Sequence, residues 1–352
     1  MKFFHAADIH LGALPDKGFP WSEERGCEIW DSFRRLIRQV GEEKADLFFI
    51  AGDLFHRQPL RRELKEINEM FASIPHTKVV LIAGNHDYLK KDSCYRGFPW
   101  APNVFCLWGK QEPCVEFPDL STAVYGISYD RQEIPDPLYH HIKPEGRQPI
   151  EILLAHGGDE KHIPFKKEIL EGAGFDYIAL GHIHKPQILS ENLMAYAGSL
   201  EPIDKNETGP HGYIRGTCGK QGTRIEFVPF AQRSYVNLKL EVNEETTQFA
   251  LEQTLKEKLY KKKGKDLYCV RILGTRGDDM EFDTERLMEL GAIREVQDLT
   301  KPAYDKDQLM KQYKGTLIES FTRRFADRKL TSMEEKAFLY GIEALLAARE
   351  DD

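Results

Sequence analysis

Residues 47–53 read Leu47-Phe48-Phe49-Ile50-Ala51-Gly52-Asp53, an apolar run that ends in a glycine and an aspartate. Five consecutive apolar residues without polar alternation are typical of a strand that is buried on both faces. The glycine allows a sharp turn, so the aspartate directly follows the strand. The pattern predicts a polar side chain at the carboxyl end of a central strand, where open α/β sheets place their functional sites.

Short apolar runs of the same kind recur through the first two thirds of the chain. We expect strands at residues 2–7, 47–51, 78–83, 122–126, 151–155 and 177–180. Between them, residues 23–43 and 60–72 carry apolar side chains at helical spacing. Strands that alternate with amphipathic helices predict an α/β fold with the helices outside the sheets.

The later part of the chain has a different pattern. Residues 194–197, 213–217 and 224–229 predict further strands with glycine-rich turns between them. A change comes near Arg233, where an alternating strand at 236–242, a helix at 246–260 and a strand at 267–273 predict a compact β-α-β unit.

Residues 306–349 predict a C-terminal helical hairpin. Its first helix would carry an apolar stripe that repeats every four residues, formed by Leu309, Tyr313, Leu317, Phe321 and Phe325. The second helix would open with Ser332-Met333-Glu334-Glu335, which we interpret as a capping box.

Length and composition limit the possible classes of protein. A chain of 352 residues is too long for one ordinary core and predicts about two domains with an appendage. None of the six cysteines forms a C-x-x-C pair, so free thiols are expected. No apolar run approaches the ~20 residues that span a bilayer, and the N-terminus lacks the features of a signal peptide. We therefore expect a cytoplasmic protein that does not bind a membrane.

The formal net charge of −8 argues against a general polyanion binder, because nonspecific DNA affinity comes from lysine and arginine. Bound metal ions can nevertheless supply local positive charge where a phosphate must lie, and a partner subunit could supply more.

Five polar motifs fall at the ends of the expected strands or in the loops after them. They are Asp8-Ile9-His10, Gly52-Asp53-Leu54-Phe55-His56, Gly84-Asn85-His86-Asp87, His156-Gly157-Gly158 and Gly181-His182-Ile183-His184. Six of the twelve histidines lie in these motifs, which is a strong concentration of metal-binding side chains. Because residues i and i+2 of an extended backbone point the same way, each of the two pairs, Asp8 with His10 and His182 with His184, is expected to project together.

The donor types indicate a class of metal. A carboxylate such as that of Asp53 can bridge two divalent ions, and Asn85 offers a neutral carbonyl oxygen. Mixed oxygen and nitrogen ligands suit Mn²⁺, Fe²⁺ or Zn²⁺, and the share of oxygen favours Mn²⁺. Taken singly, Asp8 could be a turn residue, Asn85 a helix cap and His156 a core histidine. Five such motifs in order after strands favour a metal site instead.

Together these motifs resemble those of the calcineurin-like metallophosphoesterase superfamily over about residues 1–230. The resemblance implies a four-layer α-β-β-α sandwich with two metal ions, which would activate a water and clamp a phosphate. The ligands that it implies are Asp8, His10, Asp53 and His184 for one ion, and Asp53, Asn85, His156 and His182 for the other, with Asp53 as the bridge. His86 would face the scissile phosphate, and Asp87 would orient the imidazole of His86.

Three features resemble the DNA repair nucleases of the SbcD type within that superfamily. The first is His56 in Gly52-Asp53-Leu54-Phe55-His56, because the family's histidine lies at the active site and helps to position the DNA strand; alternatively, it is a surface histidine of a loop. The second is the segment Tyr88–Phe105 after the Gly-Asn-His-Asp motif, which contains Pro99-Trp100-Ala101-Pro102-Asn103-Val104. The third is Gly198-Ser199-Leu200-Glu201-Pro202 followed by His211-Gly212-Tyr213, which resembles the end of the nuclease domain.

The same resemblance implies a domain order and partners. We expect a metallophosphoesterase domain at residues 1–232, a small α+β cap domain at 233–300 and a C-terminal helical segment at 301–352. That segment would dock an SMC-like coiled-coil ATPase through the apolar stripe, unless the stripe packs on the chain's own cap domain. A homodimer through helices of the nuclease domain is also implied.

The leading hypothesis is a Mn²⁺-dependent DNA exonuclease or endonuclease that acts in DNA repair with the ATPase. The alternative is a phosphodiesterase or phosphatase that acts on a small nucleotide or a phosphoprotein. A third hypothesis is a metal-bound scaffold without activity, against which the intact ligand set argues.

Overall fold

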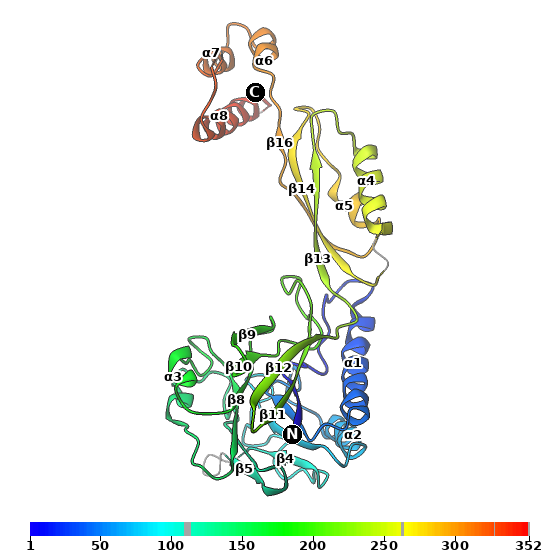
Figure 1. Cartoon of the computed structure of the whole chain (residues 1–352). Helices are drawn as coiled ribbons and strands as arrows, with labels where there is room; N and C mark the ends of the chain where they lie inside the picture. The colour runs from blue at the N-terminus through cyan, green and yellow to red at the C-terminus, as the bar shows by residue number, and fades with distance from the viewer. Residues whose placement is uncertain (109–113, 262–263, 327, 351–352) are drawn as a thin grey trace. The chain divides into compact units, whose positions relative to one another are not determined.

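The computed structural model describes residues 1–108, 114–261, 264–326 and 328–350. The chain divides into two compact units, and Figure 1 labels their strands and helices where there is room. The first unit consists of Met1–Asn237 and Gly264–Tyr268, and the second of Leu238–Lys263 and Cys269–Asp352. The division into three domains at residues 1–232, 233–300 and 301–352 stays a prediction.

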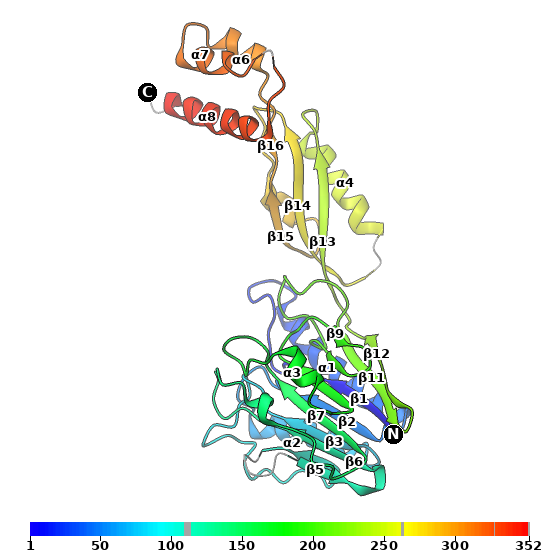
Figure 2. The ribbon, with the colours of Figure 1, turned by 60° about the vertical axis from the view of Figure 1, so that its left-hand side comes forward.

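Two six-stranded sheets form the first unit (Figure 2). The first has the order β12-β11-β1-β2-β3-β4, with bounds Gly222–Pro229, Gly212–Gly219, Lys2–Ala6, Leu47–Ala51, Lys78–Ile82 and Val104–Cys106. The second has the order β5-β6-β7-β8-β10-β9, with bounds Cys114–Phe117, Thr122–Gly126, Ile150–His156, Tyr177–Gly181, Met194–Tyr196 and Gln187–Ser190. Strands β1 to β4 pair in parallel, as do β6, β7, β8 and β10.

Apolar residues on alternate faces of the strands build three hydrophobic clusters. In the first sheet, Phe4 and Phe48 pack with helices α1 (Ser22–Glu42) and α2 (Arg61–Ala72). The neighbouring residues Phe3 and Phe49 point the other way and pack against strands of the second sheet. The outer face of the second sheet packs on α3 (Lys167–Glu171) and the 3₁₀-helix η2 (Leu138–His141).

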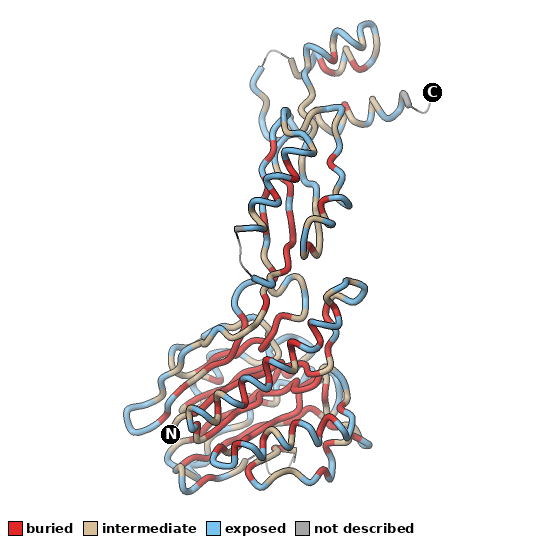
Figure 3. Tube along the Cα trace, turned by 90° about the vertical axis from the view of Figure 1, so that its right-hand side faces the viewer, coloured by how far each residue is buried: buried red, intermediate tan, exposed pale blue. Residues whose placement is uncertain are grey.

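Burial of both strand faces, visible as the red central strands of Figure 3, explains why the apolar runs are continuous. The mixed α/β class expected from the sequence is thereby confirmed, whereas the four-layer order stays a prediction. All six strands and both helices expected in the first two thirds form within one residue of the expected ends. The sequence did not predict β4, β5, β9, α3, η2 or the 3₁₀-helix η1 (Pro118–Leu120), which are short.

The sheet of the second unit has four strands. They are β13 (Tyr235–Val242), β14 (Leu267–Arg276), β15 (Ile293–Asp298) and β16 (Lys301–Pro302). Helix α4 (Gln248–Lys261) connects β13 to β14, as expected for the β-α-β unit, and α5 (Thr284–Met288) precedes β15. Among the described residues, no helix combines the length and the apolar character that crossing a membrane requires.

The described residues after 302 form three helices, so the expected two-helix hairpin is wrong. They are α6 (Lys306–Gln312), α7 (Leu317–Arg323) and α8 (Ser332–Glu350). The single helix expected before the hairpin turn is divided into α6 and α7. Gly315, which has a φ of +80°, lies in the turn between these two helices. The capping box of α8 also lies one residue earlier than expected. The amide of Thr331 donates to Oε2 of Glu334 at 2.8 Å, and the amide of Glu334 donates to Oγ1 of Thr331 at 3.3 Å.

Most side chains of the apolar stripe are packed within this helical segment. Leu309 is buried in a cluster with Phe338 and Ile342 of α8, and Tyr313, Phe321 and Phe325 pack against that cluster. Leu317 is the exception, with 69% of its surface exposed. The stripe as a whole is therefore not available as a contact surface, which corrects that part of the docking hypothesis.

Candidate metal centre

The polar motifs of both sheets meet at the carboxyl ends of parallel strands. Asp8 and His10 follow β1, Asp53 follows β2, and His156 is the last residue of β7. The loops after β1 and β2 continue side by side, because the amide of Asp8 donates to the Gly52 carbonyl at 3.2 Å and the amide of His10 to the Asp53 carbonyl at 3.1 Å. These backbone bonds bring the first two motifs together.

The ligand residues adopt unusual backbone angles. Asp8, His10, Asp53 and His182 have φ values of 49°, 52°, 50° and 97°. This left-handed region is sterically unfavourable for non-glycine residues, and residues that adopt it cluster at functional sites. The expectation that Asp8 and His10 share a face of an extended strand is wrong, since β1 ends at Ala6. Turned backbone after the strand brings their side chains together instead.

Two glycines are required by close packing behind the ligands. A Cβ atom on Gly84 would lie 2.2 Å from Oδ1 of Asp53, and one on Gly52 would lie 2.3 Å from Nδ1 of His156. Gly52 also has a φ of +88°. Any larger residue at either position would displace a ligand side chain.

The first set of donors contains Asp8, His10, Asp53 and His184. Nε2 of His10 lies 2.9 Å from Nε2 of His184 and 3.9 Å from Oδ2 of Asp53. The donor atoms of Asp8, His10 and His184 lie within 4.8 Å of one another. Asp8 is held by the amide of His182, which donates to its Oδ2 at 2.8 Å. A cation between the two facing imidazole nitrogens would satisfy both.

The second set contains Asp53, Asn85, His156 and His182. Nε2 of His156 lies 2.9 Å from Oδ1 of Asn85 and 3.4 Å from Oδ2 of Asp53. Nδ1 of His182 lies 3.1 Å from the same Asn85 oxygen. Nδ1 of His156 donates to the Ala51 carbonyl at 2.8 Å, which leaves Nε2 of this ring for the donor set. Asp53 lies near His10 of the first set and His156 of the second, and its role as the bridging ligand stays a prediction.

Two more predicted histidines lie beside the first set. The rings of His56 and His86 are stacked with centroids 5.0 Å apart, and Nδ1 of His56 lies 3.4 Å from Nδ1 of His10. The amide of His86 donates to Oδ1 of Asp53 at 2.9 Å. His56 and His86 are both partly exposed, so they border the buried donors.

The expected contact between Asp87 and the His86 imidazole is not formed. Nδ1 of His86 instead donates to the carbonyl of His56 at 3.0 Å. The Asp87 carboxylate is buried and accepts bonds from the amide of Gly84 at 2.8 Å, the amide of Phe55 at 3.2 Å and the Tyr95 hydroxyl at 2.7 Å. Asp87 therefore fixes the loops that carry the ligands, because its oxygens are occupied by these donors.

Sequence reasoning missed two carboxylates. Oδ2 of Asp159 lies 2.7 Å from Nε2 of His182, and Oε1 of Glu207 lies 2.8 Å from Nδ1 of His184. Asp159 directly follows His156-Gly157-Gly158, so a longer motif would have included it. Glu207 has no spacing signal that links it to His184.

Burial and opposing charges determine the protonation of the centre. Burial raises the pKa of Asp8 to about 6. Burial also acts on Asp53, but His156 and His10 outweigh it and hold the pKa of Asp53 far below its usual value. Burial opposes protonation of His156, yet the Asp53 carboxylate raises the pKa of His156 to about 9. Negative charge is thus concentrated on Asp53, the donor shared by both sets.

The oxygen and imidazole donors fit two divalent cations, because each set offers both donor types around a shared carboxylate. The assignment of each residue to a particular ion stays a prediction.

Comparison with known proteins places this site in a family. The model of the calcineurin-like phosphoesterase family matches residues 1–186 of the 352-residue chain. The chain is 27% identical to the uncharacterized metallophosphoesterase YhaO of Bacillus subtilis, over 78% of this chain and 71% of that protein. It is 30% identical to the DNA double-strand break repair protein Mre11 of Methanocaldococcus jannaschii, over 59% of this chain and 58% of that protein.

A further relative extends over nearly the whole chain. The SbcD component of the nuclease SbcCD from Staphylococcus epidermidis is 21% identical over 95% of this chain and 96% of that protein. The Mre11 and SbcD relatives match the branch that the sequence motifs indicated. Since the family match covers more than half of the chain and includes all five motifs, the chain belongs to the calcineurin-like phosphoesterase family and is a metal-dependent hydrolase of phosphoester bonds.

Proposed function

We propose that this protein is a DNA nuclease that cleaves phosphodiester bonds in DNA repair. The observation that carries the proposal is the place of His56, whose ring stacks on His86 and whose Nδ1 lies 3.4 Å from Nδ1 of His10. A histidine at the border of the buried donors can contact a nucleic-acid strand next to the scissile phosphate. The names of the Mre11 and SbcCD relatives support the same substrate class.

The residues of this chain divide the chemistry between them. When bound, two divalent ions would supply positive charge for the phosphate and lower the pKa of the attacking water. Asp53 and Asp8 bring the negative charge that attracts the ions. His86 has Nδ1 engaged with the His56 carbonyl, so Nε2 is the nitrogen left to face the substrate. In the doubly protonated ring this nitrogen would donate to a phosphate oxygen or to the leaving oxygen.

The metal and the partners are part of the proposal. Mn²⁺ is favoured over Fe²⁺ and Zn²⁺ because carboxylate and amide oxygens stand beside the imidazoles. An SMC-like ATPase would dock on apolar side chains that α7 and α8 leave exposed, namely Leu317, Met333 and Tyr340, which are 69%, 81% and 69% exposed. A cytoplasmic location and a homodimer belong to the same proposal.

The test is Mn²⁺-dependent cleavage by the full chain of end-labelled double- and single-stranded DNA, beside hydrolysis of bis-p-nitrophenyl phosphate. His86→Ala is the inactive variant, and His76→Ala, an exposed histidine after α2, is the matched control. DNA cleavage that His86→Ala abolishes and His76→Ala keeps would support the nuclease, and the product ladder would show its polarity. Hydrolysis of the small ester with DNA untouched would favour a nucleotide or phosphoprotein substrate instead.

A further inference from the structure

We infer that Glu207 and Asp159 are positioning residues, each of which orients one histidine of the Gly181-His182-Ile183-His184 motif toward a different metal ion. The inference deepens the proposed function and rests on its two-metal site. Both carboxylates come from loops outside the motif, and each contacts the ring nitrogen that the donor set does not use.

Glu207 fixes His184 through Nδ1. Its Oε1 accepts from that nitrogen at 2.8 Å, so the ring presents Nε2 to His10, 2.9 Å away. The second oxygen of Glu207 accepts from the amide of Ile203 at 3.1 Å and from the Ser199 hydroxyl at 3.2 Å. The Glu207 side chain is only 15% exposed. A carboxylate that is itself held at both oxygens can fix the tautomer and the rotation of the ring.

Asp159 fixes His182 through the opposite nitrogen. Its Oδ2 lies 2.7 Å from Nε2 of His182, so this ring presents Nδ1 to Asn85 at 3.1 Å. Asp159 also accepts from the amides of Lys161 and His162 at 2.9 and 3.0 Å, and from Nδ1 of His162 at 2.8 Å. The bonds from its own loop hold the carboxylate in place although its side chain is 46% exposed.

The two contacts are therefore separate. Glu207 acts on the set that contains Asp8 and His10, whereas Asp159 acts on the set that contains Asn85 and His156. Because water can partly replace an exposed carboxylate, loss of Asp159 should cost less affinity than loss of the more buried Glu207.

The experiment is calorimetric titration of the metal-free full chain with Mn²⁺, with bound Mn²⁺ followed by electron paramagnetic resonance. We expect Glu207→Gln and Asp159→Asn each to weaken one of two binding steps by about 10- to 100-fold, the range for residues that orient ligands. The weakened step should differ between the two variants. Glu160→Gln, beside Asp159 on the exposed surface, is the control and should leave both steps unchanged.

A double-variant series assigns the carboxylates to their histidines. In a His184→Ala background, Glu207→Gln should have no further effect on Mn²⁺ affinity, whereas Asp159→Asn should still weaken the other step. Unchanged affinity in both single variants would overturn the inference. Equal weakening of both steps with a lower melting temperature of the metal-free protein would overturn it too, because that result indicates a general structural role. Since no step of the test uses DNA, an inactive protein on DNA with the expected Mn²⁺ affinities would refute only the proposed function.

Discussion

Oδ2 of Asp53, after a strand of one sheet, lies 3.4 Å from Nε2 of His156, at the end of a strand of the other sheet. Asp53 also lies beside His10, so one carboxylate has donors of both sets as neighbours. We predict that Asp53→Asn lowers Mn²⁺ affinity in both binding steps by more than about 100-fold, above the usual loss for a residue that only orients a ligand. Equilibrium dialysis with metal analysis measures this, with Asp31→Asn on the exposed face of α1 as the control. If the variant bound two ions at wild-type affinity, Asp53 would not be a ligand that bridges them.

His86→Ala should separate metal binding from turnover. The amide of His86, which donates to Asp53, remains in the variant, so Mn²⁺ affinity should stay within a few-fold of wild type. Loss of the imidazole should lower turnover by about 10²- to 10⁴-fold, the usual range for one acid–base group. Steady-state hydrolysis of bis-p-nitrophenyl phosphate at saturating Mn²⁺ measures the effect. An unchanged rate would show that His86 takes no part in the chemistry.

His56→Ala should distinguish substrates. His56 borders the donors rather than belonging to the predicted ligands, so hydrolysis of a small ester should fall less than about 10-fold, below the range for an acid–base group. Cleavage of DNA should fall further, because the strand loses a contact next to the scissile phosphate. The carbonyl that holds His86 is kept in the variant. Equal losses on both substrates would contradict a role for His56 in placing DNA.

Mn²⁺ binding should release protons and strengthen as the pH rises. Despite burial, which favours the neutral rings, nearby carboxylates raise the pKa of His156 and of His184 to about 9 each in the metal-free protein. At pH 7 both rings therefore carry a proton that a metal ion must displace, so about two protons should leave per chain, and affinity should rise up to about pH 9. Calorimetry in buffers of different ionisation enthalpy counts these protons. Affinity independent of pH between 6 and 9 would refute the prediction.

The sequence predicted the fold where burial leaves a simple pattern. Strands such as β2 are apolar at every position because both faces are covered, and α1 shows its apolar face at helical spacing. Strands β4 and β9 are short and only partly buried, so no such pattern marks them. The C-terminal error has a different cause. The side chains of the apolar stripe pack together as their spacing predicts. The turn that contains Gly315 nevertheless interrupts the helix, and an apolar repeat of four residues gives no sign of such a turn.

The predicted site residues came together because strand ends on both sheets converge there. The sequence did not show which atom of each side chain makes which contact. Asp87 bonds backbone amides and Tyr95 instead of His86, and Asp159 and Glu207 were missed. Such contacts depend on the path of a loop and on which ring nitrogen faces inward. Residue types and their spacing in the sequence give neither the path of a loop nor the orientation of a ring.

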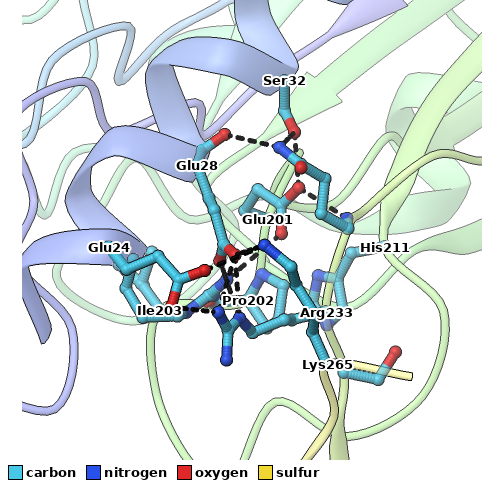
Figure 4. A network of polar contacts seen from close by, with 12 residues as sticks. Glu24, Glu28, Ser32, Glu201, Pro202, Ile203, His211, Arg233 and Lys265 are labelled. Atoms are coloured by element: carbon cyan, nitrogen blue, oxygen red, sulfur yellow. Dashed lines mark hydrogen bonds and ion pairs between the residues drawn. The ribbon is translucent and has the colours of Figure 1, made fainter. Parts of the chain in front are cut away.

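A buried ion network in the first unit gives a stability prediction. Arg25 is fully buried; its Nη1 donates to Oε2 of Glu28 at 2.8 Å and lies 3.5 Å from Oε2 of Glu201, while Nη2 donates to the Pro202 carbonyl. Glu28 also pairs with Arg233, which links α1 to the segment before β13 (Figure 4). Burial raises the pKa of Glu201. The Glu201 carboxylate also accepts from the Ser32 hydroxyl and the Gln232 amide, and Arg25 is a cation beside it.

Arg25→Met should lower the free energy of unfolding by about 3–5 kcal/mol, since it removes the cation beside the buried Glu201 carboxylate, which keeps only neutral donors. Arg34→Met, whose side chain is 45% exposed in surface pairs with Asp31 and Glu66, should cost less than about 1 kcal/mol. Urea unfolding followed by tryptophan fluorescence measures both, because all four tryptophans lie in the first unit. Adding Glu201→Gln to Arg25→Met should recover part of the loss, because the uncompensated charge is removed. If the double variant were less stable than Arg25→Met alone, the cost would come from lost packing and hydrogen bonds rather than from the charge on Glu201.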